Sequence, residues 1–166
     1  MIIAKLKLKY GERLHVHLSA GQEWADAIIP FLDHKPPKYK AHLAKALMGG
    51  CESKVHFYLG IVDDSLVAIA MTLERGEIAH LAHVYTDPLH RNRGIAKKLL
   101  RQLIDNFEDR GGRLIILGTE PNSVAETMYK KLGFRCLSGN MMLLQVNPLN
   151  PFLIEPEHFN EDLFLQ

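Results

Sequence analysis

The segment whose residue types most clearly suggest chemistry is a short basic loop ahead of an amphipathic stretch. It reads Arg91-Asn92-Arg93-Gly94-Ile95-Ala96, and Lys97 and Lys98 follow. The first turn of a helix presents unpaired backbone amides and a partial positive charge, and a glycine there lets the backbone approach a diphosphate. Because cations oppose the dipole at this end, helix stability alone does not call for them. The loop is therefore predicted to bind phosphate; the alternative is a solvated, basic first turn.

A second chemical candidate is Tyr129, within the stretch Asn122–Phe134. Helical spacing places it in one row with Ala125, beside an apolar face, and Gly133 suits the left-handed position after a helix. Taken alone, these residues are typical of an amphipathic helix with a packed tyrosine. A tyrosine is neutral at pH 7, with an ordinary pKa of about 10, so it could also give a proton to a leaving thiolate.

Three potential acid–base groups, Glu77, His80 and His83, lie on one predicted strand. A histidine has an ordinary pKa of about 6.5 and is suited to accept a proton near neutral pH. Strict alternation along the strand places His80 on the same face as Val84. It places His83 and Tyr85 together on the opposite face. The alternative for either histidine is a structural side chain that is hydrogen-bonded within the sheet.

These groups must be positioned by a framework of strands and helices. Alternating apolar residues and turn signals predict strands over residues 2–9, 12–18, 55–62, 66–73, 77–86, 114–117, 134–137 and 141–146. Helices are predicted from Trp24 to Phe31, from Tyr39 to Leu47, from Arg93 to Arg110 and from Pro121 to Gly133. Strands and helices in this order favour an α/β (α+β) fold with a mixed, partly antiparallel sheet. Many functions share that class, so function must be argued from the sites.

Length, composition and charge narrow the class of protein. A chain of 166 residues with 47% hydrophobic and 23% charged residues is typical of one globular domain. We expect this domain to span residues 1–146. An irregular acidic tail, with three prolines and four acidic residues, is expected over 147–166. The net charge of +1 gives no global field that would favour nucleic acid or a membrane surface, so an anion site must be built locally.

Targeting and metal-binding signals are weak in this sequence. Residues 1–10 alternate lysine with apolar residues, which argues against a signal peptide, and the apolar stretch 66–73 is too short to span a bilayer. A cytoplasmic location is therefore expected. Cys51 and Cys136 lack metal-ligand spacing, so we predict two buried free thiols and no metal site.

The basic loop resembles the acetyl-CoA signature of the GNAT superfamily of N-acetyltransferases, Arg/Gln-x-x-Gly-x-Gly/Ala between a strand and a helix. Here it reads Arg91-x-x-Gly94-x-Ala96, and Pro88 ahead of it fits the family too. Alanine at position 96, where glycine is common, slightly narrows the room near the phosphate. The element order from about residue 13 to residue 146 also matches the family, so the resemblance covers most of the chain.

The resemblance implies the family fold: a mixed, mostly antiparallel sheet, splayed between the fourth and fifth family strands and flanked by about four helices. It implies acetyl-CoA as donor, with its pantetheine arm along the exposed strand edge, where backbone amides polarise the thioester. It also implies that Asn122 hydrogen-bonds the pantetheine or the neighbouring strand. The implied cofactor-binding residues are Val84, Tyr85, Thr86, Arg91, Asn92, Arg93, Gly94, Ile95, Ala96 and Asn122.

The resemblance further implies catalytic roles for Tyr129 and His80. The Tyr129 hydroxyl is expected at the thioester sulfur. His80 occupies the position where histone acetyltransferases and serotonin N-acetyltransferase hold a base, and His83 or water remains an alternative. We expect direct transfer to a primary amine in a ternary complex, because neither cysteine lies in a CoA motif. The segment 24–39 is where the family usually builds its acceptor pocket, which makes Asp33, His34, Lys35 and Tyr39 candidates for acceptor contact.

Two other readings remain open at this stage. One is a non-catalytic acyl-CoA-binding sensor or interaction module that needs neither His80 nor Tyr129. The other is a scaffold that binds no CoA. The expected partner is an amine-bearing acceptor, small molecule or protein, with no nucleic acid and no membrane. Many members of the family pair, so a homodimer is a further expectation. The sequence leaves the acceptor and the acyl-chain length undetermined.

Overall fold

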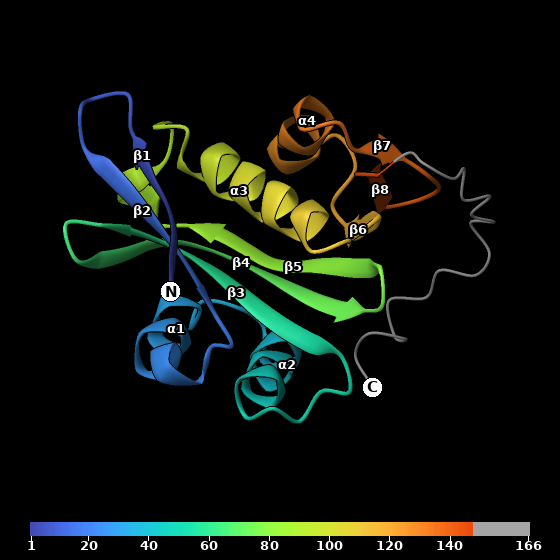
Figure 1. The fold of residues 1–166 in the computed structure, drawn as a ribbon, viewed down its shortest axis with the longest axis horizontal. Coiled ribbons are helices and arrows are strands. Elements are labelled where there is room, and N and C mark those ends of the chain that lie inside the picture. Colours follow the sequence, from blue (N-terminus) through green and yellow to red (C-terminus); the bar gives the residue numbers. More distant parts are fainter. Residues whose placement is uncertain (148–166) are drawn as a thin grey trace.

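The computed structural model describes residues 1–147, and these form one eight-stranded sheet with helices on both faces (Figure 1). The spatial order is β1-β2-β3-β4-β5-β6-β8-β7. Neighbours are antiparallel except for β5 and β6, which are parallel. The prediction of a mixed, mostly antiparallel sheet is confirmed. The strands are β1 (Ile2–Lys7), β2 (Arg13–Ser19), β3 (Lys54–Val62), β4 (Ser65–Arg75), β5 (Ile78–Thr86), β6 (Leu114–Gly118), β7 (Arg135–Cys136) and β8 (Met141–Gln145).

The helices divide between the two faces of the sheet. α1 (Ala25–Phe31) and α2 (Pro37–Leu47) lie on one face, and α3 (Ile95–Asp109) and α4 (Val124–Lys131) lie on the other (Figure 1). Two short 3-10 turns, η1 (Gln22–Trp24) and η2 (Pro88–His90), precede α1 and α3. Ile95, Leu99, Leu103 and Phe107, on one side of α3, are buried against the sheet.

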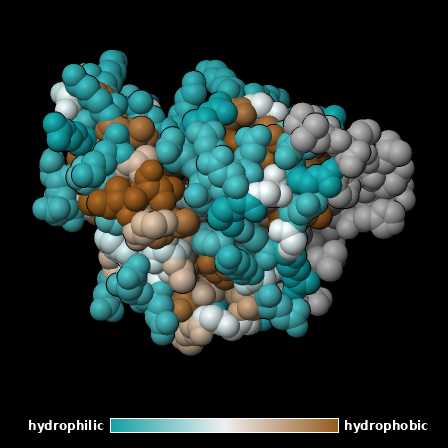
Figure 2. Space-filling model, viewed as in Figure 1, coloured by the Kyte–Doolittle hydropathy of each residue, from teal (hydrophilic) through white to brown (hydrophobic). Residues whose placement is uncertain are grey.

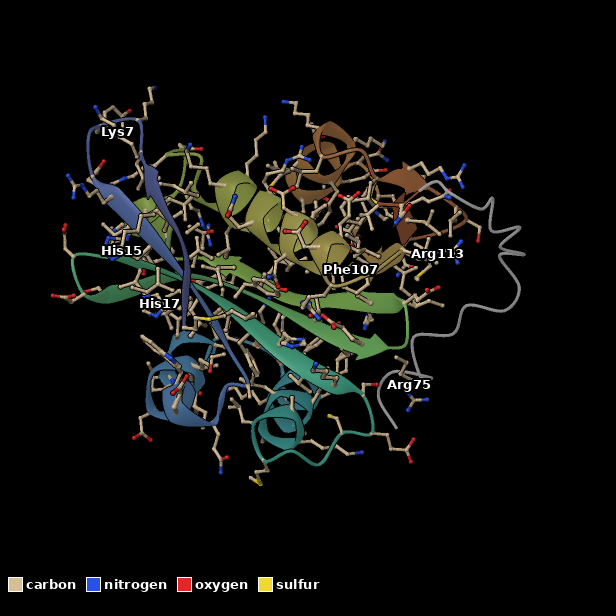
Figure 3. The ribbon with its side chains drawn as sticks, viewed as in Figure 1. Lys7, His15, His17, Arg75, Phe107 and Arg113 are labelled. Atoms are coloured by element: carbon tan, nitrogen blue, oxygen red, sulfur yellow. The ribbon has the colours of Figure 1, made fainter. Side chains whose placement is uncertain are left out.

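Two apolar clusters fill the spaces between the sheet and its helices. Phe107 of α3 is buried in the first, which also contains Leu99 and Leu103 (Figure 3). Ile28 of α1 and Leu43 of α2 belong to the second. The face seen in Figure 2 carries mostly hydrophilic residues, with apolar side chains gathered in smaller areas. The sheet therefore separates two cores, and a site that crosses its plane can draw residues from both helical layers.

Helix starts differ from the predicted ones for reasons of capping. α4 begins at Val124 rather than Pro121, because the Ser123 hydroxyl accepts a hydrogen bond from the amide of Glu126 at 3.1 Å. The Glu126 carboxylate in turn accepts one from the amide of Asn122 at 2.8 Å. α3 begins at Ile95, after a left-handed Gly94, rather than at Arg93.

The structure also bears on the cysteines, on the C-terminal tail and on membrane-spanning segments. Cys136 is exposed and Cys51 is partly exposed, so the prediction of two buried thiols is wrong; the Cys136 thiol donates to Glu126 instead. The predicted acidic tail, 147–166, lies outside the described residues except for Asn147. Within residues 1–147, no helix has the length and apolar character needed to cross a membrane.

Candidate active site

The central feature of the site is the place where β5 and β6 part. They are paired only at Ile78, Ala79 and His80, opposite residues 114–116 of β6. Within the described part of the chain, β6 continues to pair with β8 as far as Gly118, whereas β5 has no registered partner on that side beyond His80. The predicted splay is confirmed, and one edge of β5 is open from Leu81 onward.

A bulge in β5 reverses the predicted facing of its side chains. Ala82 lies opposite Met71, but Tyr85 lies opposite Ile69, so β5 holds one more residue than β4 over this span. His83 carries the irregularity, with a φ of 51°. Tyr85 consequently packs with the α1 and α2 layer. Leu73, which lies directly opposite His80 on β4, packs in the same layer, so His80 faces that side of the sheet too.

Val84, on the other side of the sheet, packs against the α3 layer. The prediction that His80 shares a face with Val84 is therefore wrong, because strict alternation does not allow for the extra residue.

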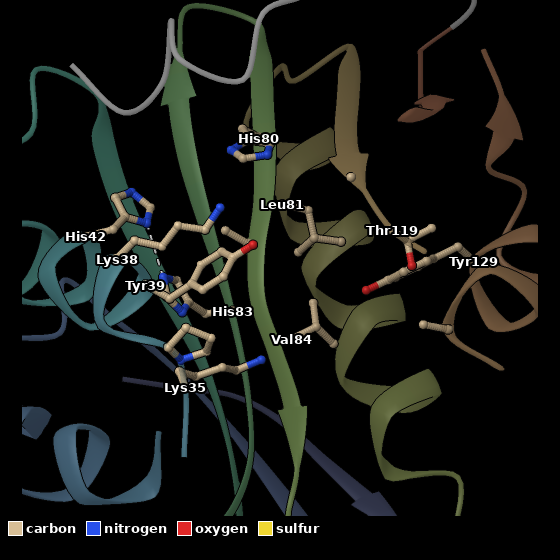
Figure 4. A pocket seen from close by; sticks show the side chains of 14 residues that line it. Lys35, Lys38, Tyr39, His42, His80, Leu81, His83, Val84, Thr119 and Tyr129 are labelled. Atoms are coloured by element: carbon tan, nitrogen blue, oxygen red, sulfur yellow. Dashed lines mark hydrogen bonds between the residues drawn. The ribbon is translucent and has the colours of Figure 1, made fainter. Parts of the chain in front are cut away.

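A cavity of about 460 Å³ surrounds this open edge (Figure 4). It brings His80 and Tyr129 to one space, with the β5 backbone between the two layers. Of the predicted site residues, His80, Val84 and Tyr129 line it. Its other lining residues are Lys35, Pro36, Lys38, Tyr39, His42, Leu81, Ala82, His83, Gly118, Thr119 and Ala125.

The two β5 histidines of the cavity are buried and held neutral. Burial, and then the nearby His42, lowers the pKa of His80 to about 4. Burial, with His42 and Lys35 contributing, lowers the pKa of His83 to about 3. His42 Nδ1 lies 3.1 Å from His83 Nε2, and the two rings stack. Both β5 histidines are therefore uncharged at neutral pH and can accept a hydrogen bond or a proton.

His42 is a residue of the site that the sequence reasoning missed. It lies on α2 and lines the cavity together with Tyr39, three residues earlier on the same helical face. The available signal was this i, i+3 spacing of an aromatic and a polar group on the helix that begins at the end of the predicted acceptor segment. Its contact with His83, 41 positions away, could not be read from spacing.

Tyr129 forms part of the opposite wall. Its ring packs against Phe134, with centroids 5.6 Å apart, and its hydroxyl points into the cavity (Figure 4). Burial raises the pKa of Tyr129 to about 12, so the hydroxyl stays protonated over the whole physiological range.

The predicted phosphate loop leads into the first turn of α3, and its two arginines make different contacts within the protein. Gly94 caps α3 with a φ of 77°, and the first turn contains no acidic residue. Arg93 donates to Glu12 at 2.8 Å and to the carbonyl of Leu89 at 3.0 Å, which ties the loop to the β1–β2 hairpin. The charge of Arg93 is thus already paired within the protein.

Arg91 is held differently from Arg93. Its Nε donates to the carbonyl of Thr86 at 3.1 Å, and its guanidinium lies over the ring of Tyr85. This arrangement links the loop directly to the open end of β5.

The remaining predicted cofactor residues lie outside the cavity wall. Tyr85 and Thr86 are at the end of β5, and Ile95, the first residue of α3, is buried in the core. Asn92 and Asn122 are exposed and have positive φ angles of 60° and 61°. The backbone of Asn122 is used in capping α4.

Of the four acceptor candidates, two line the cavity and two do not. Lys35 and Tyr39 line the cavity. Asp33 instead pairs with Lys40 at 2.6 Å, and the ring of His34 packs on Tyr85. Among residues 1–147 there is no group of three or more histidine, cysteine or acidic side chains placed to hold a metal ion.

Comparison with known proteins identifies the family. The family model described as "Acetyltransferase (GNAT) family" matches residues 22–134, from the start of η1 to the residue before β7. The chain belongs to this family. A curated relative, the [ribosomal protein bS18]-alanine N-acetyltransferase of Salmonella typhimurium, is 36% identical over 73 residues, 43% of this chain and 49% of the relative. The chain spans less than half the length of either curated relative that it matches, 28% of one and 49% of the other.

Solved GNAT structures share the fold at low identity. The ribosomal-protein-S18-alanine N-acetyltransferase from Escherichia coli is 20% identical, with a TM-score of 0.64, covering 84% of this chain and 99% of that one. The PaiA N-acetyltransferase from Thermoplasma acidophilum, solved in complex with coenzyme A, is 16% identical. Its TM-score is 0.59, covering 78% of this chain and 98% of that one. The sheet of this GNAT protein and its helices therefore follow the family architecture.

Proposed function

We propose that this chain is an N-acetyltransferase that moves an acetyl group from acetyl-CoA to a primary amine by direct attack in a ternary complex. The observation that carries the proposal is that one cavity at the open edge of β5 brings the side chains of Tyr129, His80 and His83 together. Tyr129 is on one wall of this cavity, and the two histidines are on the facing side. Family membership supports the donor, and the two relatives named as ribosomal-protein alanine N-acetyltransferases support an amine acceptor.

The donor is proposed to enter from the start of α3. The diphosphate lies at the amides of the first turn, beside Gly94, where no acidic residue opposes it. The amide of Asp87 donates to Val67 of β4, and successive strand amides point to opposite sides, so those of Val84 and Thr86 face the open edge. Each amide placed at the thioester oxygen would stabilise the transition state by roughly 2.7–4 kcal/mol.

The histidines are proposed to receive the proton of the acceptor. The amine nitrogen attacks the thioester carbonyl carbon, the carbon–sulfur bond breaks, and the ammonium proton must leave. An alkylamine has an ordinary pKa of about 10.4, far above that of His80, so full transfer to this imidazole is uphill. His80 is therefore best suited to accept a hydrogen bond from an amine that is already neutral, or to pass its proton on through water. His83 is the alternative for this role.

Tyr129 is proposed to assist the leaving sulfur. A thiol has an ordinary pKa of about 8.5, whereas that of Tyr129 is raised to about 12, so complete proton transfer from the tyrosine is also uphill. Donation of a hydrogen bond to the developing thiolate needs no such transfer, and the final proton can come from solvent.

The test is thiol release from acetyl-CoA with a panel of small amines, peptides and polyamines. Tyr129→Phe and His80→Ala should each lower kcat by about a hundredfold. Tyr10→Phe is the matched control, because Tyr10 is 66% exposed on the β1–β2 turn. If both site variants keep full turnover at saturating acetyl-CoA, the roles given to these residues are wrong.

Binding separates the proposed enzyme from the two other readings. Coenzyme A at a hundred times its dissociation constant should stabilise the protein by about 2.7 kcal/mol in a thermal-shift experiment. Binding without turnover across the amine panel would indicate a sensor or interaction module. A folded protein that no CoA species stabilises would indicate a scaffold.

A further inference from the structure

The acceptor side of the cavity carries two lysines and no acidic group. Lys35 lies in the segment between α1 and α2, and Lys38 lies in the first turn of α2. In the part of the chain that the structure describes, no aspartate or glutamate lines the cavity. Figure 4 shows both lysine side chains extending toward β5.

Neither lysine is ion-paired with a described carboxylate. Lys35 Nζ lies 5.9 Å from the centre of the Tyr85 ring, and Lys38 Nζ lies 4.9 Å from that of Tyr39. The neighbouring Lys40 is different, since it pairs with Asp33 at 2.6 Å. Aromatic faces attract a cation without cancelling its charge. The two ammonium charges therefore remain available inside the cavity.

The start of α2 increases the positive potential at the lysines, and the nearby neutral histidines leave it unchanged. The start of α2 lies at this wall, with Pro36 lining the cavity and no acidic residue in its first turn. Its helix dipole adds a partial positive charge. The neutral histidines do not offset it. Burial lowers the pKa of Lys35, which shows that its charged form is partly desolvated and would gain from an anionic partner.

We propose that the acceptor is an amino acid or a similarly small amine with a carboxylate, held by Lys35 and Lys38, while its amine faces His80 and His83. This inference rests on the proposed function. A cavity of about 460 Å³ must also admit the acyl end of the donor, which leaves room for a small acceptor. The same two lysines disfavour polyamines, whose several positive charges they repel. They also favour the neutral, reactive form of the acceptor amine.

The experiment compares acceptors with and without the carboxylate, with kcat/KM referred to the neutral amine, because the amide also lowers the pKa of that amine. Alanine is paired with alaninamide, and phenylalanine with phenylalaninamide; spermidine and an alanine-initiated peptide complete the panel. We expect kcat/KM to be at least about tenfold higher for each acid than for its amide. Lys35→Met and Lys38→Met should remove that preference by raising the KM of the acid, with the KM of acetyl-CoA unchanged. Lys40→Met, the matched control on α2, should retain the preference.

A binding measurement makes the test independent of turnover. With coenzyme A bound, calorimetry should detect N-acetylalanine but not N-acetylalaninamide, and Lys35→Met should abolish that difference. Equal or faster turnover of amides, spermidine or the peptide would overturn the acceptor class while leaving the proposed function intact. A higher KM for acetyl-CoA alone in the lysine variants would overturn it too, by assigning the lysines to the donor. If no amine releases thiol and no N-acetylated acid binds, both proposals fail.

Discussion

Two buried polar clusters lie on opposite faces of the same sheet and differ in how far their charged groups are paired within the protein. On the α3 face, Glu74 of β4 accepts two hydrogen bonds from Arg110, at 2.7 and 2.8 Å, and one from Thr72 at 2.8 Å. His56 Nδ1 lies 3.1 Å from the same carboxylate, and Tyr58 contacts Arg110. On the α2 face, the cavity gathers histidines and lysines with no described acidic residue in its lining.

The pKa values reflect this difference. Burial alone would raise the pKa of Glu74, but the hydrogen bonds from Arg110, together with His56 and Thr72, hold it at about 2. Burial lowers the pKa of His80 to about 4 and that of His83 to about 3, and their neighbouring groups push in the same direction. The first cluster is complete within the protein. We propose that the second is completed by the donor and acceptor that it binds, so we assign a structural role to the first and a chemical role to the second.

Removing one partner from the completed cluster should give the largest effect. In Arg110→Ala, the Glu74 carboxylate, 6% exposed, stays buried but loses both hydrogen bonds from the guanidinium. The free energy of unfolding, measured by urea denaturation, should fall by about 3–5 kcal/mol. Lys40→Ala breaks the exposed pair with Asp33 and serves as control, with an expected change below about 1 kcal/mol. A loss for Arg110→Ala as small as that of the control would contradict the assignment.

The two clusters should also lose stability in different pH ranges. An unfolded histidine binds a proton below about pH 6.5, whereas folded His80 and His83 stay neutral to about 4 and 3. Unfolding therefore takes up protons between these values, and stability falls as the pH drops from 7 to 5, by about 2 kcal/mol per histidine. Glu74 is deprotonated in both states above its ordinary pKa of 4.5, so its contribution is lost only below that pH and down to about 2.

Urea denaturation at pH 7, 6 and 5 checks this assignment. His83→Asn, which tolerates the positive φ, should remove about 2 kcal/mol of the decline, and Glu74→Gln should leave the decline over this range unchanged. If both variants decline like the parent protein, the histidines are not the cause.

What could be predicted from the sequence depends on how far apart along the chain the interacting residues lie. The sequence was sufficient to predict the basic loop, the position of Tyr129 and the order of elements, because these depend on local spacing and capping. The bulge at His83 depends on how β5 registers against β4, and a shift of one residue reverses the faces without any change in local pattern. The pairing of Arg93 with Glu12 and the contact of His42 with His83 join residues 81 and 41 positions apart. The periodic pattern of apolar residues along the chain does not reveal contacts between residues so far apart.

Removing His42 should affect activity more than stability, which sharpens the contrast with Arg110. His42→Ala removes the side chain that contacts His83 at 3.1 Å and helps to orient it. We expect kcat to fall by about tenfold, with the KM of acetyl-CoA unchanged. The free energy of unfolding should change by less than about 1 kcal/mol. His42→Asn, which keeps a hydrogen-bonding group near the Nδ1 position, should restore part of kcat; a purely packing role would lower the melting temperature and show no such rescue.

The smallest expected effect is that of pH on the proposed catalytic groups, His80, His83 and Tyr129. Between pH 5 and 9, His80 and His83 stay neutral and Tyr129 stays protonated, because their pKa values are about 4, 3 and 12. The rise of kcat/KM with pH should then follow the ionisation of the acceptor ammonium alone, without an inflection near 6.5. Two acceptors of different amine pKa separate the sources, since the inflection should move with the acceptor. An inflection near 6.5 that stays fixed would mean that a cavity histidine carries the proton in the free enzyme and is not held neutral by burial.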